Sequence, residues 1–171
     1  VNPRTGRAGK KENVHYVSAF HAEIDYGNDG HKKKSDYETY DEAIKAITKF
    51  KPQPTLINLS GGGLHCYWVL KTPVKTIEIG VKELESINKY FLQQLGGDKG
   101  THNLDRVLRI PGTYNFKLPD NPREVRVVHT NGPVYDMDDF KPFINIEDSK
   151  RKDTDDRKKS EPTISESSLM T

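Results

Sequence analysis

The stretch TLINLSGGGLHCYWVLK, residues 55–71, decides the fold because two β-prone apolar runs are joined by three consecutive glycines. Glycine loses more backbone freedom on folding than any other residue, so three in a row need a structural reason. One interpretation is a β-hairpin turn followed by a surface histidine, His65. The other is a loop whose bare amides approach a bound phosphate, with His65 beside them. Both interpretations remain open from this stretch alone.

Patterns on both sides of this stretch predict an α+β fold. Period-two alternation predicts strands at 14–26, 55–60, 64–71, 106–110 and 124–130. Apolar residues at helical spacing predict helices at 37–50 and 76–95. The order strand, helix, strand, strand, helix, strand, strand indicates a ferredoxin-like or RRM-like sheet, antiparallel or mixed, backed by two helices.

The composition indicates one main domain with a modest core, because 33% of the 171 residues are hydrophobic and 30% are charged. We expect a core at 1–144, taken as a fragment of a larger protein because the chain opens at Val1. From about residue 145 the sequence turns to mixed charge, which predicts a flexible linker or tail at 145–171. The net charge of +2 is too small to indicate nucleic acid on its own.

The single cysteine, Cys66, excludes an internal disulfide and a cysteine-rich zinc site. It fits a reducing compartment, so we expect a cytoplasmic protein. No apolar run approaches the roughly 20 residues of a membrane span, and no membrane association is expected.

An acidic pair, Glu23 and Asp25, stands in the first predicted strand. Residues i and i+2 of a strand share a face, so both carboxylates point the same way, while Phe20, Ala22 and Ile24 take the other face. Two such carboxylates repel each other unless a cation lies between them. A half-exposed strand with a solvated acidic face is the alternative, and the local pattern does not decide between the two.

Another acid and several cations follow the second predicted helix. Asp98 comes directly after the helix end, and Arg106, Arg109 and Lys117 follow within twenty residues. One acid trailed by cations suits a site that binds metal and polyphosphate together, whereas a helix-terminating loop acid is the alternative. Asp105 is a rival acid that directly precedes Arg106 and could pair with it. Strict strand alternation would place Arg106 and Arg109 on opposite faces.

The order and spacing of these motifs resemble the archaeo-eukaryotic primase (AEP) superfamily, in the primase-polymerase branch of plasmids, phages and some CRISPR-linked genes. That family has an acidic pair, a serine- or glycine-rich turn with histidine, and an acid followed by basic residues. Here the motifs look like AEIDYG (22–27), SGGGLHCYW (60–68) and GGDKG…RVLRIPGTYNFK (96–117). The opening NPRTGRAGK also resembles a segment upstream of the first motif. The likeness spans residues 1 to about 130 and departs from the family at Glu23, where Asp is usual.

The resemblance implies a catalytic core with an RRM-like sheet, in which Glu23, Asp25 and Asp98 hold two divalent ions, Mg²⁺ or Mn²⁺, for nucleotidyl transfer. The triphosphate contacts that it implies are Ser60, Gly62, Gly63, His65, Arg106, Arg109, Lys117 and Arg4. Asn2 and the basic loop Lys32–Lys34 are further candidate contacts. The implied partners are (d)NTPs, a single-stranded DNA template with its primer, and an accessory primase domain or other domains of the same larger protein.

Two other classes of protein compete with this interpretation of a DNA primase-polymerase. A catalytically silent RRM-like module reads bases with aromatic side chains on its sheet face. An acidic pair on that face would repel phosphate without metals, which favours the enzyme. A relaxase or replication initiator needs a nucleophilic tyrosine and usually a histidine cluster, and the sequence contains no such cluster.

Overall fold

The computed structural model of the chain describes residues 10–27 and 35–145. Within them, five strands form one sheet in the order β1-β3-β2-β5-β4, and each neighbouring pair is antiparallel. The strands are β1 (Tyr16–Asp25), β2 (Leu56–Leu59), β3 (Gly63–Lys75), β4 (Thr113–Asn115) and β5 (Arg123–His129). The helices are α1 (Tyr40–Lys49), α2 (Thr76–Ile79) and α3 (Val81–Gln94), and the 3₁₀ turns are η1 (Lys11–Asn13), η2 (Lys99–Thr101) and η3 (Met137–Phe143). The predicted α+β class is confirmed.

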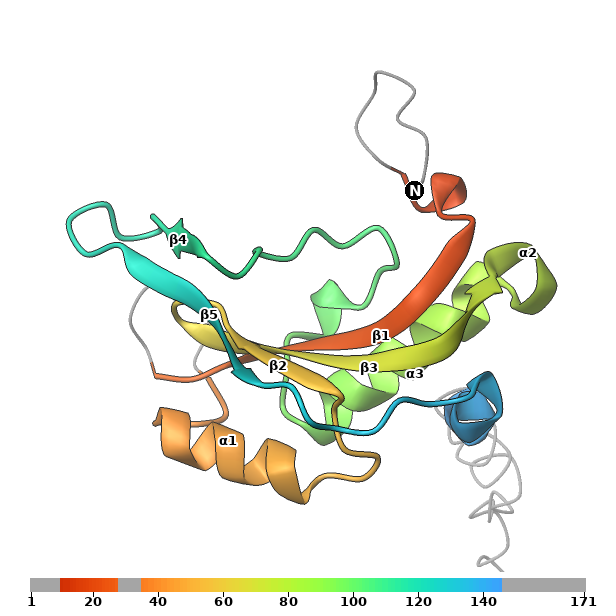
Figure 1. Ribbon diagram of the computed structural model, residues 1–171, viewed down its shortest axis with the longest axis horizontal. Coiled ribbons are helices and arrows are strands. Elements are labelled where there is room, and N and C mark those ends of the chain that lie inside the picture. Colours follow the sequence, from red (N-terminus) through yellow and green to blue (C-terminus); the bar gives the residue numbers. More distant parts are fainter. Residues whose placement is uncertain (1–9, 28–34, 146–171) are drawn as a thin grey trace, which may run out of the picture.

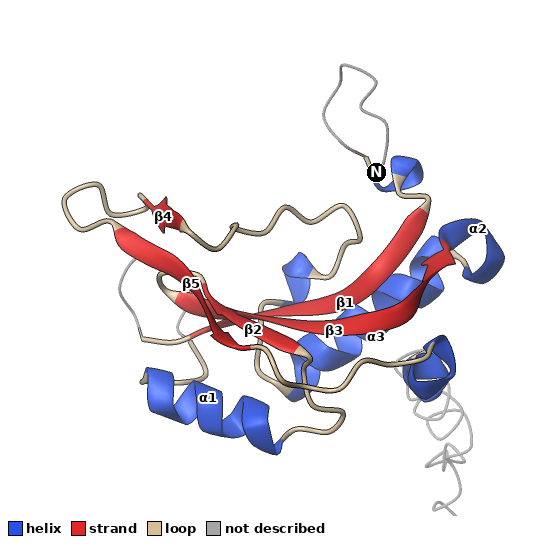
Figure 2. Cartoon of the chain, in the orientation of Figure 1, coloured by secondary structure: helices blue, strands red, loops and turns tan. Residues whose placement is uncertain are grey.

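The sheet has one face covered by helices and one face crossed by a loop. Helices α1 and α3 lie on the same side of the sheet (Figure 1). On the opposite side, the long loop between η2 and β4 runs over the strands (Figure 2). The hydrophobic core therefore forms on the helix side, and the polar residues of the strands are left for the loop side.

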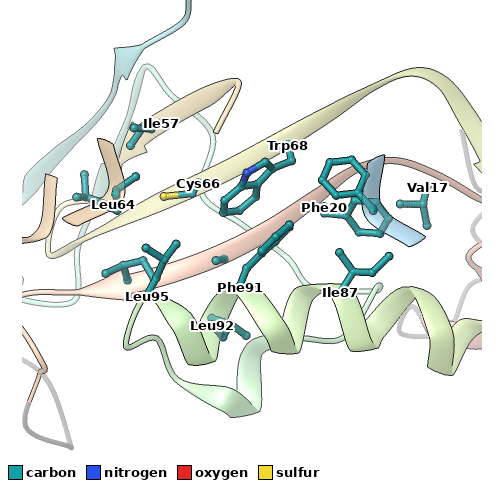
Figure 3. Packing of buried hydrophobic residues seen from close by; sticks show 14 of the residues in the cluster. Val17, Phe20, Ile57, Leu64, Cys66, Trp68, Ile87, Phe91, Leu92 and Leu95 are labelled. Carbon is teal, nitrogen blue, oxygen red and sulfur yellow. The ribbon is translucent and has the colours of Figure 1, made fainter. Parts of the chain in front are cut away.

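Alternation along β1 and β3 builds this core. The inward-facing side chains of the two strands are almost fully buried, namely Phe20, Ala22, Ile24, Leu64, Cys66 and Trp68. The Trp68 ring stacks on Phe91 of α3, with ring centroids 4.0 Å apart and planes 24° apart (Figure 3). Helix α3 therefore packs on β1 and β3 from one side, and the polar side chains of these strands point to the opposite side.

The strand register places the acidic pair beside the glycine hairpin. In the β1–β3 pairing, Glu23 lies opposite His65 and Asp25 lies opposite Gly63. The hairpin between β2 and β3 closes at the Leu59–Leu64 pair. The first two motifs therefore meet at one end of the sheet, although they are about 40 residues apart in the sequence.

The predicted helix at 76–95 is divided into α2 and α3 by Gly80. Its φ of +106° lies outside the right-handed helical region, so the helix is interrupted for one residue. The predicted helix at 37–50 forms as α1, and Thr39 and Glu42 make a capping box at its start.

The predicted strand at 106–110 is wrong. These residues form a loop, and β4 begins only at Thr113. Val107 is 90% exposed and Ile110 is 71% exposed, so the apolar alternation in this segment faces no core. A short alternating pattern indicates a strand only where a neighbouring strand and a buried face exist, and this loop has neither.

Some predictions fall outside the described residues. They concern Arg4, Asn2, Lys32–Lys34 and all of the tail at 145–171 except Asn145. Among the residues that are described, no helix is both long and apolar enough to cross a membrane.

Candidate functional site

A cavity of about 260 Å³ opens on the polar face, between the end of β1, the glycine hairpin, η2 and the segment from Arg106 to Arg123. Its lining contains most of the residues singled out from the sequence: Glu23, Asp25, Ser60, Gly62, Asp98, Arg106, Arg109 and Lys117. Further lining residues are Gly61, Thr101, Asn115, Leu118, Asn121 and Arg123. Gly63 and His65 are absent from this lining, although both lie directly behind it. The cavity thus collects three acids and four cations around one volume.

The three acids reach the cavity from two elements. Glu23 and Asp25 end β1 on the polar face, and Asp98 begins η2, where its carboxylate accepts a hydrogen bond of 3.0 Å from the Gly100 N–H. A Cβ on Gly97 would lie 2.5 Å from the Glu23 carbonyl oxygen. Only glycine therefore allows the chain to leave α3 so close to β1, and this close approach brings Asp98 to the acidic pair.

Glu23 is paired with a cation and lies close to a buried histidine. The Arg106 guanidinium donates to both carboxylate oxygens, from Nε to Oε1 and from Nη2 to Oε2 at 3.3 Å. This pairing raises the pKa of Arg106 above its ordinary value. His65 Nε2 lies 3.9 Å from Glu23 Oε2. The alternative pairing of Arg106 with Asp105 is wrong, because Asp105 instead accepts a hydrogen bond from the Asn103 side chain.

His65 is buried beneath Glu23 and is not on the surface. Its side chain is 4% exposed, and burial lowers its pKa to about 4, although the Glu23 charge acts in the opposite direction. The ring is therefore neutral near pH 7. Its Nδ1 has no hydrogen-bond partner within the described part of the chain. A neutral imidazole in this position packs beneath the Glu23 carboxylate without adding a positive charge to the site.

The glycine run forms a tight hairpin, without the surface histidine of that interpretation, and it also borders the cavity, so contact of its amides with a phosphate stays a prediction. The Ser60 N–H and Oγ both donate to the Gly63 carbonyl, at 2.8 and 3.0 Å, which leaves Gly61 and Gly62 as the two turn residues. Gly61 has a φ of +84°, as hairpin turns of this length require. Asn115 fills the space where a Gly61 side chain would lie, because a Cβ there would be 2.8 Å from the Asn115 Cβ.

The cations come from the loop and from the far strands. Arg106 and Arg109 both line the cavity, so the expected placement on opposite faces is wrong, since the segment is not a strand. The side chains of Arg109 and Lys117 form no hydrogen bond or ion pair with any residue that the structure describes. Their charges are therefore available to an anion in the cavity.

Sequence reasoning missed two cavity residues that depend on the sheet topology. Asn115 of β4 donates from Nδ2 to the Ser60 carbonyl at 3.0 Å, and Arg123 of β5 donates from Nη1 to the Gly61 carbonyl at 3.3 Å. These contacts tie the hairpin to strands more than 50 residues later in the chain. No local pattern around Asn115 or Arg123 indicates this role.

Three carboxylates line the cavity, and carboxylate oxygens are the type of ligand that a hard divalent cation prefers. In the arrangement described, however, Glu23 is engaged by Arg106. Within residues 10–27 and 35–145, no group of three or more His, Cys, Asp and Glu side chains is positioned to hold a metal ion. A metal ion at Glu23 would therefore compete with Arg106 for the same carboxylate.

Comparisons with known proteins agree with this architecture. No protein-family model and no curated protein matches the chain. Among solved structures, the AEP domain of the cyanophage S-2L primase-polymerase is similar to this chain, with a TM-score of 0.56 and 18% sequence identity. The chain has an AEP fold. The alignment covers 79% of this chain and 64% of the phage chain, so the chain spans less than two thirds of that AEP domain structure.

A second solved structure, that of primase RepB′, is similar at 12% identity and a TM-score of 0.46. That alignment covers 82% of this chain and 45% of the other. The AEP fold assigned here therefore depends on the phage domain, and it confirms the fold relationship that the three sequence motifs indicated.

Proposed function

We propose that this AEP-fold chain is the catalytic core of a DNA primase-polymerase, which transfers nucleotides from (d)NTPs to start and extend primers on single-stranded DNA. One observation carries the proposal: Glu23, Asp25 and Asp98 line the same cavity as two cations without a described partner, Arg109 and Lys117. Acids beside available cations suit a site that takes a metal-bound triphosphate.

The three carboxylates would hold two divalent ions, Mg²⁺ or Mn²⁺. Ions held there would lower the pKa of an attacking hydroxyl group and would neutralise charge on the phosphates. The chain's own residues do the remaining work. Arg109 and Lys117 bind the phosphates through their charges, and the amides of Gly61 and Gly62 lie close enough to the cavity for the backbone to contribute.

Arg106 has two roles in this proposal. Without a nucleotide it pairs with Glu23, and with a triphosphate present its guanidinium has a second anion to bind. Direct contact of Ser60, Gly63 and His65 with the triphosphate stays a prediction. The accessory domain, the cytoplasmic location and any CRISPR-linked pathway are likewise proposals about the whole protein.

The decisive experiment is primer synthesis on single-stranded DNA with labelled nucleotides and Mg²⁺ or Mn²⁺. Asp25→Asn should abolish the products, because it removes a carboxylate charge from the cavity with little change in shape. Asp41→Asn is the matched control, since Asp41 is an exposed acid in the first turn of α1, and its products should persist. Synthesis that survives Asp25→Asn would contradict the assignment of the acidic pair.

A catalytically silent RRM-like nucleic-acid-binding module is the second candidate. It is favoured by the engagement of Glu23 with Arg106 and by the lack of a ready three-residue metal group in the described chain. Metal-dependent nucleotide binding without synthesis by the parent would indicate an incomplete catalytic core. A parent chain that neither synthesises primers nor binds nucleotides would establish the silent module.

A further inference from the structure

The segment from Arg106 to Lys117 exposes an unusual amount of apolar surface. We call Val107, Ile110, Tyr114 and Phe116 the apolar strip; they are 90%, 71%, 58% and 65% exposed. The other large hydrophobic side chains exposed within the described residues, Tyr16, Ile77, Val127 and Val134, are spread along the chain. Isolated exposed apolar residues are ordinary, whereas four within ten positions, two of them neighbouring aromatic rings, suggest an interaction site.

The two aromatic residues of the strip lie beside the cavity in the chain but are not among the residues that line it. Asn115 and Lys117 line the cavity, and Tyr114 and Phe116 alternate with them in the chain. Within β4, neighbouring residues point to opposite faces, so Tyr114 projects away from Asn115, and the Phe116 ring lies close to the Tyr114 ring. Their centroids are 6.4 Å apart. β4 is one of the two edge strands of the sheet, and within the described residues its outer edge pairs with no further strand.

The charges around the strip indicate the class of its partner. Residues 106–117 contain three cations and no acid. Arg109 lies between two residues of the strip and Lys117 directly follows it, and neither cation has an ion-pair partner among the described residues. On the neighbouring strand β5, Glu124 lies opposite Tyr114, and its carboxylate lies 3.9 Å from Arg126 Nε. Aromatic rings interleaved with available cations match the bases and phosphates of a single nucleic-acid strand.

We propose that Tyr114 and Phe116, with Arg109 and Lys117, form a stacking platform for single-stranded nucleic acid at the edge of the cavity. Successive bases stack on the two rings, and the cations bind the phosphates. A strand-binding surface beside the cavity would serve primer synthesis only if the cavity binds nucleotides. The inference therefore rests on the proposed function. A protein partner fits less well, because protein interfaces are depleted of lysine at their apolar centre.

The test compares two labelled strands of about 16 nucleotides, one of thymidylate and one abasic, by fluorescence anisotropy with the full chain and without metal or nucleotide. The variant Tyr114→Ala/Phe116→Ala should bind the thymidylate strand at least tenfold more weakly than the parent, on the order of the effect of stacked bases. The affinity of this variant for the abasic strand should equal that of the parent. Ile77→Ala/Val134→Ala removes equally exposed apolar side chains elsewhere and should change neither.

The charge component is tested separately with Lys117→Gln. This variant should bind both strands more weakly and reduce the slope of log affinity against log salt by about one. Circular dichroism checks that each variant is folded, which is expected because the replaced side chains are exposed. An equal loss on thymidylate and abasic strands, an unchanged affinity of the aromatic variant, or no binding by the parent at low salt would overturn the platform. Self-association that the aromatic variant abolishes, without an effect on DNA, would identify a protein surface instead.

The outcomes also separate this inference from the proposed function. Asp25→Asn should still bind the strand, because Asp25 is not part of the platform. Strand binding that depends on the two rings, in a chain that synthesises nothing, would leave the platform standing and contradict the enzyme. Synthesis that is indifferent to the two rings would contradict the platform alone.

Discussion

His65 shows how one buried side chain links the core to the site. It lies under Glu23 with its side chain 4% exposed, and burial lowers its pKa to about 4. The unfolded chain keeps the ordinary value of 6.5, so below that pH the unfolded state binds more protons at this position. His65 therefore favours folding above pH 6.5, and this contribution is lost as the pH falls towards 4.

We expect an NMR titration in chelator to show that the His65 ring stays neutral down to about pH 4. The difference from the ordinary value corresponds to about 3 kcal/mol of unfolding free energy lost on acidification. His65→Gln should remove this part of the pH dependence, which isolates it from the carboxylates that titrate in the same range. A His65 titration near pH 6.5 would contradict the burial argument.

Arg106 and Glu23 carry a second prediction at this scale. Because the guanidinium engages Glu23, Arg106→Gln should tighten Mn²⁺ binding roughly fivefold, the equivalent of about 1 kcal/mol for a partly exposed ion pair. Electron paramagnetic resonance of free Mn²⁺ measures the affinity. Arg109→Gln is the matched control, because it removes a cavity charge that has no hydrogen bond to Glu23, and its effect should be smaller. Equal effects of the two variants would mean that general charge, and not the pair, governs metal binding.

At the scale of elements, the glycine hairpin depends on two separate constraints. Gly61 has a φ of +84°, and a side chain there would also meet Asn115 of β4. Gly112 has nearly the same backbone angle, +85°, but nothing lies within 4 Å of its Cβ position. The two glycines therefore form a natural pair for separating backbone strain from steric conflict.

We expect Gly112→Ala to lower the unfolding free energy by about 1 kcal/mol through backbone strain alone. Gly61→Ala should cost about 2 to 4 kcal/mol, because the contact with Asn115 adds to the same strain. Urea denaturation followed by circular dichroism gives both values. If the two variants lose the same stability, the packing of β4 on the hairpin is looser than described.

At the scale of the whole molecule, the residues that stabilise the fold and the residues proposed to bind a strand lie in different places on the sheet. Phe91 is fully buried against Trp68 on the helix side, whereas Phe116 is 65% exposed at the sheet edge. Phe91→Ala should cost about 3 to 5 kcal/mol of unfolding free energy. Phe116→Ala should change it by no more than about 0.5 kcal/mol. A large loss from Phe116→Ala in urea denaturation would mean that the edge carries part of the core.

The same division explains which features could be predicted from the sequence. Alternation around Phe20 and Ile24 identified the core face of β1, and it placed Glu23 and Asp25 together on the opposite face. A hairpin was one of the two interpretations of the glycine run, and the periodicity at 76–95 predicted the helical segment that covers the core, although Gly80 divides it. These features are local, because backbone geometry alone decides which side chains in one element share a face.

The tertiary structure decided what the local patterns could not. It made 106–110 a loop, because no strand lies beside it, and this placed Arg106 and Arg109 in one cavity. It brought Arg123 to the Gly61 carbonyl, because β5 pairs with β2. Contacts of this kind depend on which distant strands become neighbours. That choice is made by the packing of the complete sheet, and no single segment contains enough information to predict it.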